Sequence, residues 1–156
     1  MNIYVTAGAG SASTSLGAFD QALLAAGIAN YNLIYLSSIV PHGSTIVTGE
    51  RPQLSGEWGD RLYVVIAQAR TSIPNVEAWA GLGWAQHEET GKGLFVEHHG
   101  ASKSTVEREI EQSLETLMQG RPNEKFGPIQ MQVEGLRCET APVCVLVAAT
   151  FITENW

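Results

Sequence analysis

The sequence has few charged residues. Asp, Glu, Lys and Arg make up 16% of its 156 residues, whereas apolar residues make up 44%. A chain with so little charge leaves apolar surface for other subunits to cover. Only nine residues are Lys or Arg, they are scattered, and the net charge is −7. This composition argues against nucleic acid as a partner, and it accommodates a cationic ligand more easily than an anionic one.

Long hydrophobic runs and a basic N-terminal region are also lacking. The chain starts with MNIYVTAGAG, where no Lys or Arg precedes a long apolar segment. No signal peptide is therefore expected, and no stretch is long enough to span a bilayer. We expect a cytoplasmic protein that does not bind membranes.

Cysteine is scarce as well. The two cysteines, Cys138 and Cys144, flank the sequence ETAPV and could face each other across a hairpin. Free thiols in a reducing compartment are the simpler interpretation. Two cysteines at this spacing do not make a zinc site.

The four histidines do not suggest a metal site either. His98 and His99 are adjacent in a predicted strand, so their side chains point to opposite faces. His42 and His87 are isolated in the sequence. We expect no metal, and the sequence assigns no role to these histidines.

Apolar patterns predict about eight strands and two long helices in one domain, residues 1–156. The strands are expected at 2–5, 33–36, 44–49, 61–69, 76–86, 93–100, 129–136 and 143–152. A parallel sheet needs a crossover helix for nearly every strand, and two helices cannot supply them. The prediction is therefore an α+β sandwich of mostly antiparallel sheets, with a helix covering the outside of each sheet.

The first helix follows a stretch of small residues, AGAGSAST (7–14). Such a loop could bind phosphate at a helix N-terminus, but G-K-[ST] and a third glycine at dinucleotide spacing are missing. A tight strand-to-helix turn is the favoured interpretation. Gly27 is expected to end the helix. Its predicted apolar face consists of Leu16, Phe19, Leu23 and Leu24.

The second helix has the clearest pattern in the sequence. Ser104 and Glu107 fit a capping box, and Gly120 is expected to end the helix. Its apolar stripe consists of Val106, Ile110, Leu114, Leu117 and Met118.

The segment NLIYLSSIVPHG (32–43) places two serines, Ser37 and Ser38, after an apolar strand. No G-x-S-x-G elbow surrounds them, so a hydrolase nucleophile is not expected. The Ser38 hydroxyl could instead attack the Ser37 carbonyl and convert the amide to an ester. β-Elimination and hydrolysis would then leave a pyruvoyl group at position 38. This requires a strained turn and a donor for the oxyanion, which Asn32 could supply if the strand folds back.

Two carboxylates have both ordinary and functional interpretations. Glu97 interrupts the apolar run GLFV, so it lies either at an exposed strand end or in a functional, partly desolvated position. A desolvated glutamate could carry a proton at neutral pH. Asp20 follows Phe19 on the flank of the first helix, and it is either solvated or part of a site for a cation.

The block GAFDQALLAAGIANYNLIYLSSIVP (17–41) resembles the core of the pyruvoyl-dependent arginine decarboxylases. That family carries the pattern F-D-x-A-L-L-x-A-G-I-x-N-x-N-L-[IV]-x-x-S-S-I-x-P. GLFVEHHG (93–100) is similar to the family's G-L-[IV]-[MF]-E-x-x-G strand. The sequence departs from the family at His42, which replaces a second proline, and in the loop LSGEWGDRLYVV.

The resemblance implies a four-layer αββα fold and a trimeric assembly, as a homotrimer or a dimer of trimers, with sites between subunits. It implies self-cleavage between Ser37 and Ser38, with Asn32 assisting and Ser38 becoming the pyruvoyl cofactor. That cofactor, rather than PLP or a metal, would form a Schiff base with arginine and accept the electrons left by CO₂. Glu97 would then protonate the product, agmatine, and Asp20 would hold the guanidinium.

Other functions stay open at this point. The substrate could be another basic amino acid. The chain could also be an unprocessed paralogue that serves as a binding or assembly module. A phosphate binder built on AGAGSAST is the remaining alternative.

Overall fold

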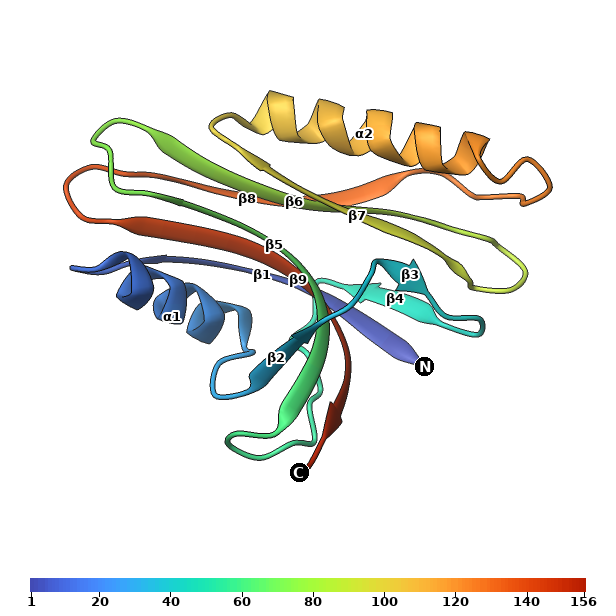
Figure 1. Cartoon of the computed structure of the whole chain (residues 1–156), viewed down its shortest axis with the longest axis horizontal. Helices are drawn as coiled ribbons and strands as arrows, with labels where there is room; N and C mark the ends of the chain where they lie inside the picture. Colours follow the sequence, from blue (N-terminus) through green and yellow to red (C-terminus); the bar gives the residue numbers. More distant parts are fainter.

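The computed structural model describes residues 1–156 as four layers, with two sheets stacked face to face between two helices (Figure 1). One outer layer is α1 and the other is α2. The helices are α1 (Ser15–Ala26) and α2 (Lys103–Gln119). The strands are β1 (Asn2–Ser11), β2 (Asn32–Tyr35), β3 (Ile39–Val40), β4 (Thr45–Thr48), β5 (Arg61–Thr71), β6 (Glu77–Gln86), β7 (Gly93–Gly100), β8 (Gln130–Arg137) and β9 (Val143–Glu154).

The sheet order confirms the predicted α+β class. The five-stranded sheet runs β2-β5-β9-β1-β4, and the four-stranded sheet runs β3-β7-β6-β8. Only the β1–β4 and β2–β5 pairs are parallel; all other pairs are antiparallel. β2 and β3 lie at edges of different sheets, so the segment between them crosses from one sheet to the other.

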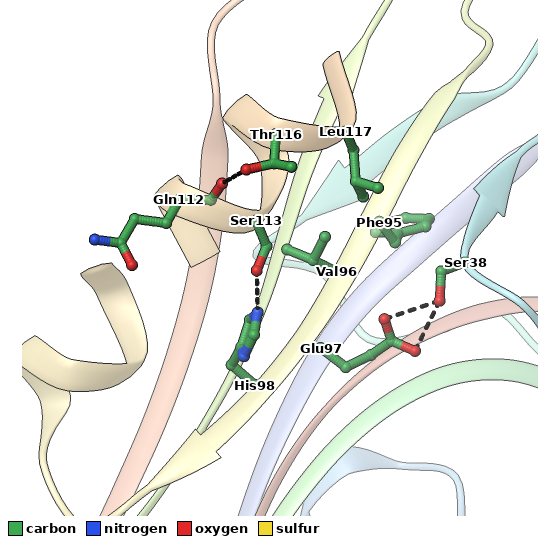
Figure 2. A pocket seen from close by; sticks show the side chains of 9 residues that line it. All are labelled: Ser38, Phe95, Val96, Glu97, His98, Gln112, Ser113, Thr116 and Leu117. Atoms are coloured by element: carbon green, nitrogen blue, oxygen red, sulfur yellow. Dashed lines mark hydrogen bonds between the residues drawn. The ribbon is translucent and has the colours of Figure 1, made fainter. Parts of the chain in front are cut away.

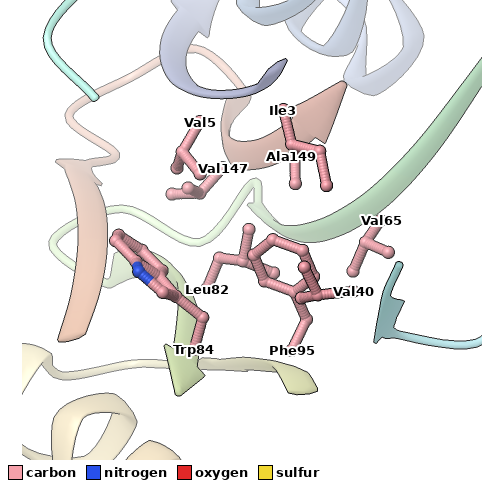
Figure 3. Close-up of a cluster of buried hydrophobic side chains, with 9 residues drawn as sticks. All are labelled: Ile3, Val5, Val40, Val65, Leu82, Trp84, Phe95, Val147 and Ala149. Carbon is pink, nitrogen blue, oxygen red and sulfur yellow. The ribbon is translucent and has the colours of Figure 1, made fainter. Parts of the chain in front are cut away.

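Apolar side chains from both sheets meet in the middle of the sandwich. Trp84 and Phe95 pack with ring centroids 6.3 Å apart. Burial of each large side chain stabilises the fold by about 1.5–3 kcal/mol. The cluster, drawn in Figure 3, consists of Ile3, Val5, Val40, Val65, Leu82, Trp84, Phe95, Val147 and Ala149.

The predicted apolar stripe of α2 is confirmed for its central residues. Val106, Ile110 and Leu114 are fully buried against the four-stranded sheet. Leu117 is different, because it is 37% exposed. The predicted cap was wrong: Ser102, not Ser104, is the N-cap, and its hydroxyl accepts a hydrogen bond from the Thr105 N–H at 3.3 Å.

The predicted apolar face of α1 was only half right: Phe19 and Leu23 are partly buried and pack against the core. The buried residues are Ala18, Ala22 and Ala26, whereas Leu16 and Leu24 are exposed. The alanines face two glycines of β1: a Cβ on Gly8 would lie 2.0 Å from the Ala22 carbonyl oxygen, and one on Gly10 would lie 2.6 Å from the Ala22 backbone nitrogen. Small residues occupy the buried face of α1 because they let the helix and strand backbones approach closely. Gly27 ends the helix in the left-handed region, as predicted.

These contacts confirm the tight strand-to-helix turn expected in AGAGSAST, but the turn is shorter than predicted. The first half of AGAGSAST is not a loop, because β1 continues through Ser11 and pairs with β9. The turn into α1 contains only residues 12–14, and Thr14 caps the helix by accepting from the Gly17 N–H at 3.0 Å. The small residues therefore allow α1 to pack closely on β1. The phosphate-binding interpretation required a long loop before the helix, and that loop is not present.

The two cysteines are free and buried. Burial raises the pKa of the Cys144 thiol, with the nearby Arg70 opposing the shift. No group of three or more His, Cys, Asp or Glu side chains is placed to hold a metal ion. Neither helix is long and apolar enough to cross a membrane.

Candidate active site

Ser37 and Ser38 form the crossing between the two sheets. On one side of the pair, the Leu36 N–H donates to the Val64 carbonyl of the five-stranded sheet at 2.9 Å. On the other side, the Phe95 N–H donates to the Ser38 carbonyl at 2.8 Å. The two bonds tie the ends of a short segment to different sheets.

This crossing strains the backbone at Ser38. Its φ is +59°, in the left-handed region that a residue with a Cβ rarely adopts. The conformation costs on the order of 1–2 kcal/mol. The hydrogen bonds to both sheets hold the segment in this conformation despite the cost. The strain therefore lies on the residue whose preceding peptide bond is expected to break.

The Ser38 side chain contacts the predicted carboxylate. Its hydroxyl lies 2.7 and 2.8 Å from the two carboxylate oxygens of Glu97 and donates its hydrogen to that carboxylate. Phe95 and Glu97 lie on the same face of β7 because side chains alternate along a strand. Phe95 is buried between the sheets, while Glu97 is exposed near the crossing. The interruption of GLFV by Glu97 thus marks the place where the core ends and the site begins.

Ser38 and Glu97 line a cavity of about 550 Å³ between β7 and α2 (Figure 2). β3 pairs with β7 only at Gly93 and Leu94. Beyond that point the edge of β7 has no neighbouring strand in its sheet. The remaining lining residues are Phe95, Val96, His98, Gln112, Ser113, Thr116 and Leu117.

His98 connects β7 to α2 at the other end of this cavity. Its Nε2 lies 2.7 Å from the Ser113 hydroxyl, and its Nδ1 lies 3.5 Å from the Glu109 carboxylate. The His98 side chain is 26% exposed. In Figure 2 it points toward α2, whereas Glu97 points toward Ser38.

The structure does not bring the other two predicted site residues to this cavity within one chain. Asn32 is at the start of β2, where its side-chain N–H donates to the Gly59 carbonyl at 2.6 Å. The strand does not fold back toward Ser38. Asp20 is exposed on α1, which packs on β1, β9 and β5, in the layer opposite α2 (Figure 1). His42 and His99 are exposed and do not line the cavity.

Sequence reasoning missed the contribution of α2 to the cavity. Ser113 and Thr116 resemble solvated helix residues, and Leu117 resembles part of the buried stripe. A signal was nevertheless present, because Glu109, Ser113 and Thr116 recur at i, i+4 and i+7 beside the apolar stripe. Such spacing places all three on one flank of the helix.

Comparison with known proteins adds to this geometry. The family model described as pyruvoyl-dependent arginine decarboxylase matches residues 2–155. The chain belongs to the pyruvoyl-dependent arginine decarboxylase family. The match spans both Ser37-Ser38 and Glu97, and so includes the crossing segment and the strand β7 that form the reactive end of the cavity.

Individual members of the pyruvoyl-dependent arginine decarboxylase family differ in how much of the chain they match. The protein of that name from Halobacterium salinarum is 39% identical over 95 residues, covering 61% of this chain and 58% of its own length. The Thermococcus sibiricus protein is 30% identical over 141 residues, covering 90% of this chain and 87% of its own. The matched part of this chain therefore spans less than two thirds of the Halobacterium protein.

A solved pyruvoyl-dependent histidine decarboxylase overlaps 67% of this chain and 54% of its own, with a TM-score of 0.45 and 8% identity. That similarity is too low to bear on the activity of this chain.

Proposed function

We propose that this protein cleaves itself between Ser37 and Ser38 and then decarboxylates arginine to agmatine and CO₂. The observation that carries the proposal is the conformation and the surroundings of Ser38. Ser38 is strained at φ +59°, its hydroxyl donates to Glu97, and it opens onto a cavity with room for an amino acid. The family membership supports the same chemistry.

The self-cleavage uses only groups of this chain and water. The Ser38 hydroxyl oxygen attacks the Ser37 carbonyl carbon, and the peptide C–N bond breaks to give an ester. Loss of the Ser38 α-proton then breaks the Cβ–O bond and frees the Ser37 carboxylate. The resulting dehydroalanine tautomerises to an imine, and water hydrolyses this to the pyruvoyl ketone with release of ammonia. Release of the strain at Ser38 favours the first step.

The residues around Ser38 fit a pyruvoyl group. The group is smaller than the serine with its preceding peptide, and it would lie between Glu97 and the apolar side chain of Phe95 at the cavity end. When present, it supplies an electrophilic carbonyl that accepts the electrons left by CO₂. Glu97, which contacts Ser38, would hold a proton at this point and deliver it to the product carbon.

We assign Asp20 to the substrate guanidinium and Asn32 to assistance in cleavage, both contributed by a second copy of the chain. A carboxylate binds a guanidinium with two parallel hydrogen bonds. Both residues are exposed, and the Asn32 amide has a second N–H besides the one that donates to Gly59, so both can reach a neighbouring subunit. The exposed outer face of α1 around Leu16 and Leu24 supports a trimer in which this surface is covered.

Intact-mass measurement of the purified protein tests the proposal. Self-cleavage gives fragments of 37 and 119 residues (156 − 37), and the larger one is blocked to N-terminal sequencing. Ser38→Ala should give only the full-length chain, because no hydroxyl remains to attack. A wild-type protein that stays uncleaved after long incubation would favour the unprocessed binding module instead.

The substitution Glu97→Gln separates cleavage from decarboxylation. Glutamine can still accept the Ser38 hydrogen bond, so self-cleavage should continue. Decarboxylation should fall by about 10²–10⁴-fold, because the amide cannot deliver a proton to the product. CO₂ release from a panel of basic amino acids measures this effect and also decides whether arginine or another basic amino acid is preferred. Wild-type turnover in this variant would remove Glu97 from the reaction.

A further inference from the structure

At the cavity end distant from Ser38, the Thr116 hydroxyl already donates its hydrogen within α2. Thr116 Oγ1 donates its hydrogen to the Gln112 backbone carbonyl at 2.9 Å. A hydroxyl has one hydrogen and two lone pairs, so Thr116 can only accept a hydrogen bond from a ligand in the cavity.

The Ser113 hydroxyl also has its hydrogen engaged, in this case by His98. The Glu109 carboxylate lies beside Nδ1 of His98, at 3.5 Å, which favours the tautomer with its proton on Nδ1. Nε2 is then the acceptor, and the Ser113 hydroxyl, 2.7 Å away, donates its hydrogen to it. The lone pairs of Ser113 remain for a ligand.

The two hydroxyls form one surface. Ser113 and Thr116 are three residues apart, which makes them neighbours on a helix, and both line the cavity. Phe95, Val96 and Leu117 supply its apolar lining (Figure 2). The cavity thus combines a reactive end at Ser38, apolar walls, and two neighbouring hydroxyls that can only accept hydrogen bonds from a ligand.

We propose that Ser113 and Thr116 bind the cationic distal group of the substrate, and that His98 and Glu109 are positioning residues that orient the Ser113 hydroxyl. This inference rests on the proposed function and specifies how that site selects its substrate. A guanidinium has five N–H donors and no acceptor, so it fits the two accepting hydroxyls of Ser113 and Thr116. The methylenes of arginine would lie against Val96 and Leu117, and its remaining N–H groups stay available to Asp20.

Binding to the uncleaved Ser38→Ala protein, measured by calorimetry, tests this without turnover. In that background, Ser113→Ala and Thr116→Val should each weaken arginine binding about tenfold or more, the effect of losing a hydrogen bond to a charged group. Agmatine keeps the guanidinium and lacks the carboxylate, so its binding should weaken by the same factor. Ser104→Ala is the matched control, because Ser104 is exposed on α2 and does not line the cavity. It should change neither ligand.

The positioning role of His98 has its own readout. His98→Leu removes the acceptor for the Ser113 hydrogen and should weaken arginine and agmatine binding together. His98→Gln offers a carbonyl oxygen to the same hydroxyl and should restore part of the loss. If both variants lower the melting temperature equally and leave ligand binding unchanged, His98 only fastens α2 to β7 and the positioning role is refuted.

Three results would overturn the proposal. The first is unchanged arginine binding in both Ser113→Ala and Thr116→Val. The second is a loss for arginine without a loss for agmatine, because it would place the α-carboxylate at these hydroxyls. The third is an uncleaved protein that binds neither ligand. A wild-type protein that releases no CO₂ from any amino acid would instead refute the proposed function, and the binding results would still decide this inference.

Discussion

The two helical layers cover their sheets in opposite ways, although glycines lie beneath both. Under α1, Gly8 and Gly10 admit the helix backbone itself, with Ala22 as the nearest residue. Under α2, Gly83 admits a side chain, because its nearest neighbour is Ile110. The backbone of α2 is therefore separated from its sheet by aliphatic side chains. One flank of this helix borders the cavity. The α1 layer is closed, so it can contribute to a site only through its outer face.

The largest expected effect tests the closed α1 layer. A Cβ on Gly8 would lie 2.0 Å from the Ala22 carbonyl oxygen, so either β1 would shift within its pairing with β9 or α1 would move off the sheet and lose its packing. Gly8→Ala should lower the free energy of unfolding by about 3 kcal/mol or more. Denaturant titration measures this. Gly120→Ala is the control: its φ is −68° and its nearest contact is 3.4 Å, so it should cause no loss.

The second prediction tests the side-chain contact of the α2 layer. A Cβ on Gly83 would lie 2.1 Å from Cγ2 of Ile110. Gly83→Ala should cost about 1–3 kcal/mol, and Ile110→Ala about 2–5 kcal/mol. The double variant should cost less than the sum, because removing the isoleucine removes the clash. Strictly additive costs would mean that this contact does not set the spacing between α2 and β6.

The third prediction asks whether the outer face of α1 contributes charge to the site. Asp20→Asn keeps the shape of the side chain and removes its charge. Arginine use should weaken by about 1.5–3 kcal/mol, typical of a hydrogen bond to a charged group, while self-cleavage proceeds. CO₂ release from arginine, lysine and ornithine measures the ranking. An unchanged ranking would make Asp20 a solvated helix residue and leave cation recognition to α2.

The same contrast explains which helix the sequence predicted well. The stripe of α2 consists of large aliphatic residues at helical spacing, and these carry a strong signal. In α1 the buried residues are Ala18, Ala22 and Ala26, whose small size gives almost no signal beside leucine and phenylalanine. The pattern also made AGAGS appear to be a loop. Only the pairing with β9 shows that its glycines belong to a strand.

The candidate site was partly accessible from the sequence. Ser38 and Glu97 were identified from the serine pair, the interrupted strand and the family resemblance, but their contact joins residues 59 positions apart. No local pattern specifies such a contact. Ser113 and Thr116 were missed because the cavity that they line depends on where β3 leaves β7. Asn32 was a candidate donor only if its strand folded back, and in the structure its side chain donates to the Gly59 carbonyl instead.

The smallest effect on folding concerns the exposed leucines of α1. Leu16 is 71% exposed and Leu24 is 46% exposed, so replacing both with serine removes little buried surface from the single chain. The free energy of unfolding of a monomer should change by only about 0.5 kcal/mol per site. If the proposed trimer covers this face, the same variant should lose assembly, because the contact it would remove is between subunits. Light scattering after size exclusion gives the mass in solution, and Ile73→Ser, at a 63% exposed position outside α1, is the matched control. A variant that keeps the wild-type mass would show that the apolar face of α1 is not the interface, and it would remove the support that this face gives to placing Asp20 in the cavity of a neighbouring subunit.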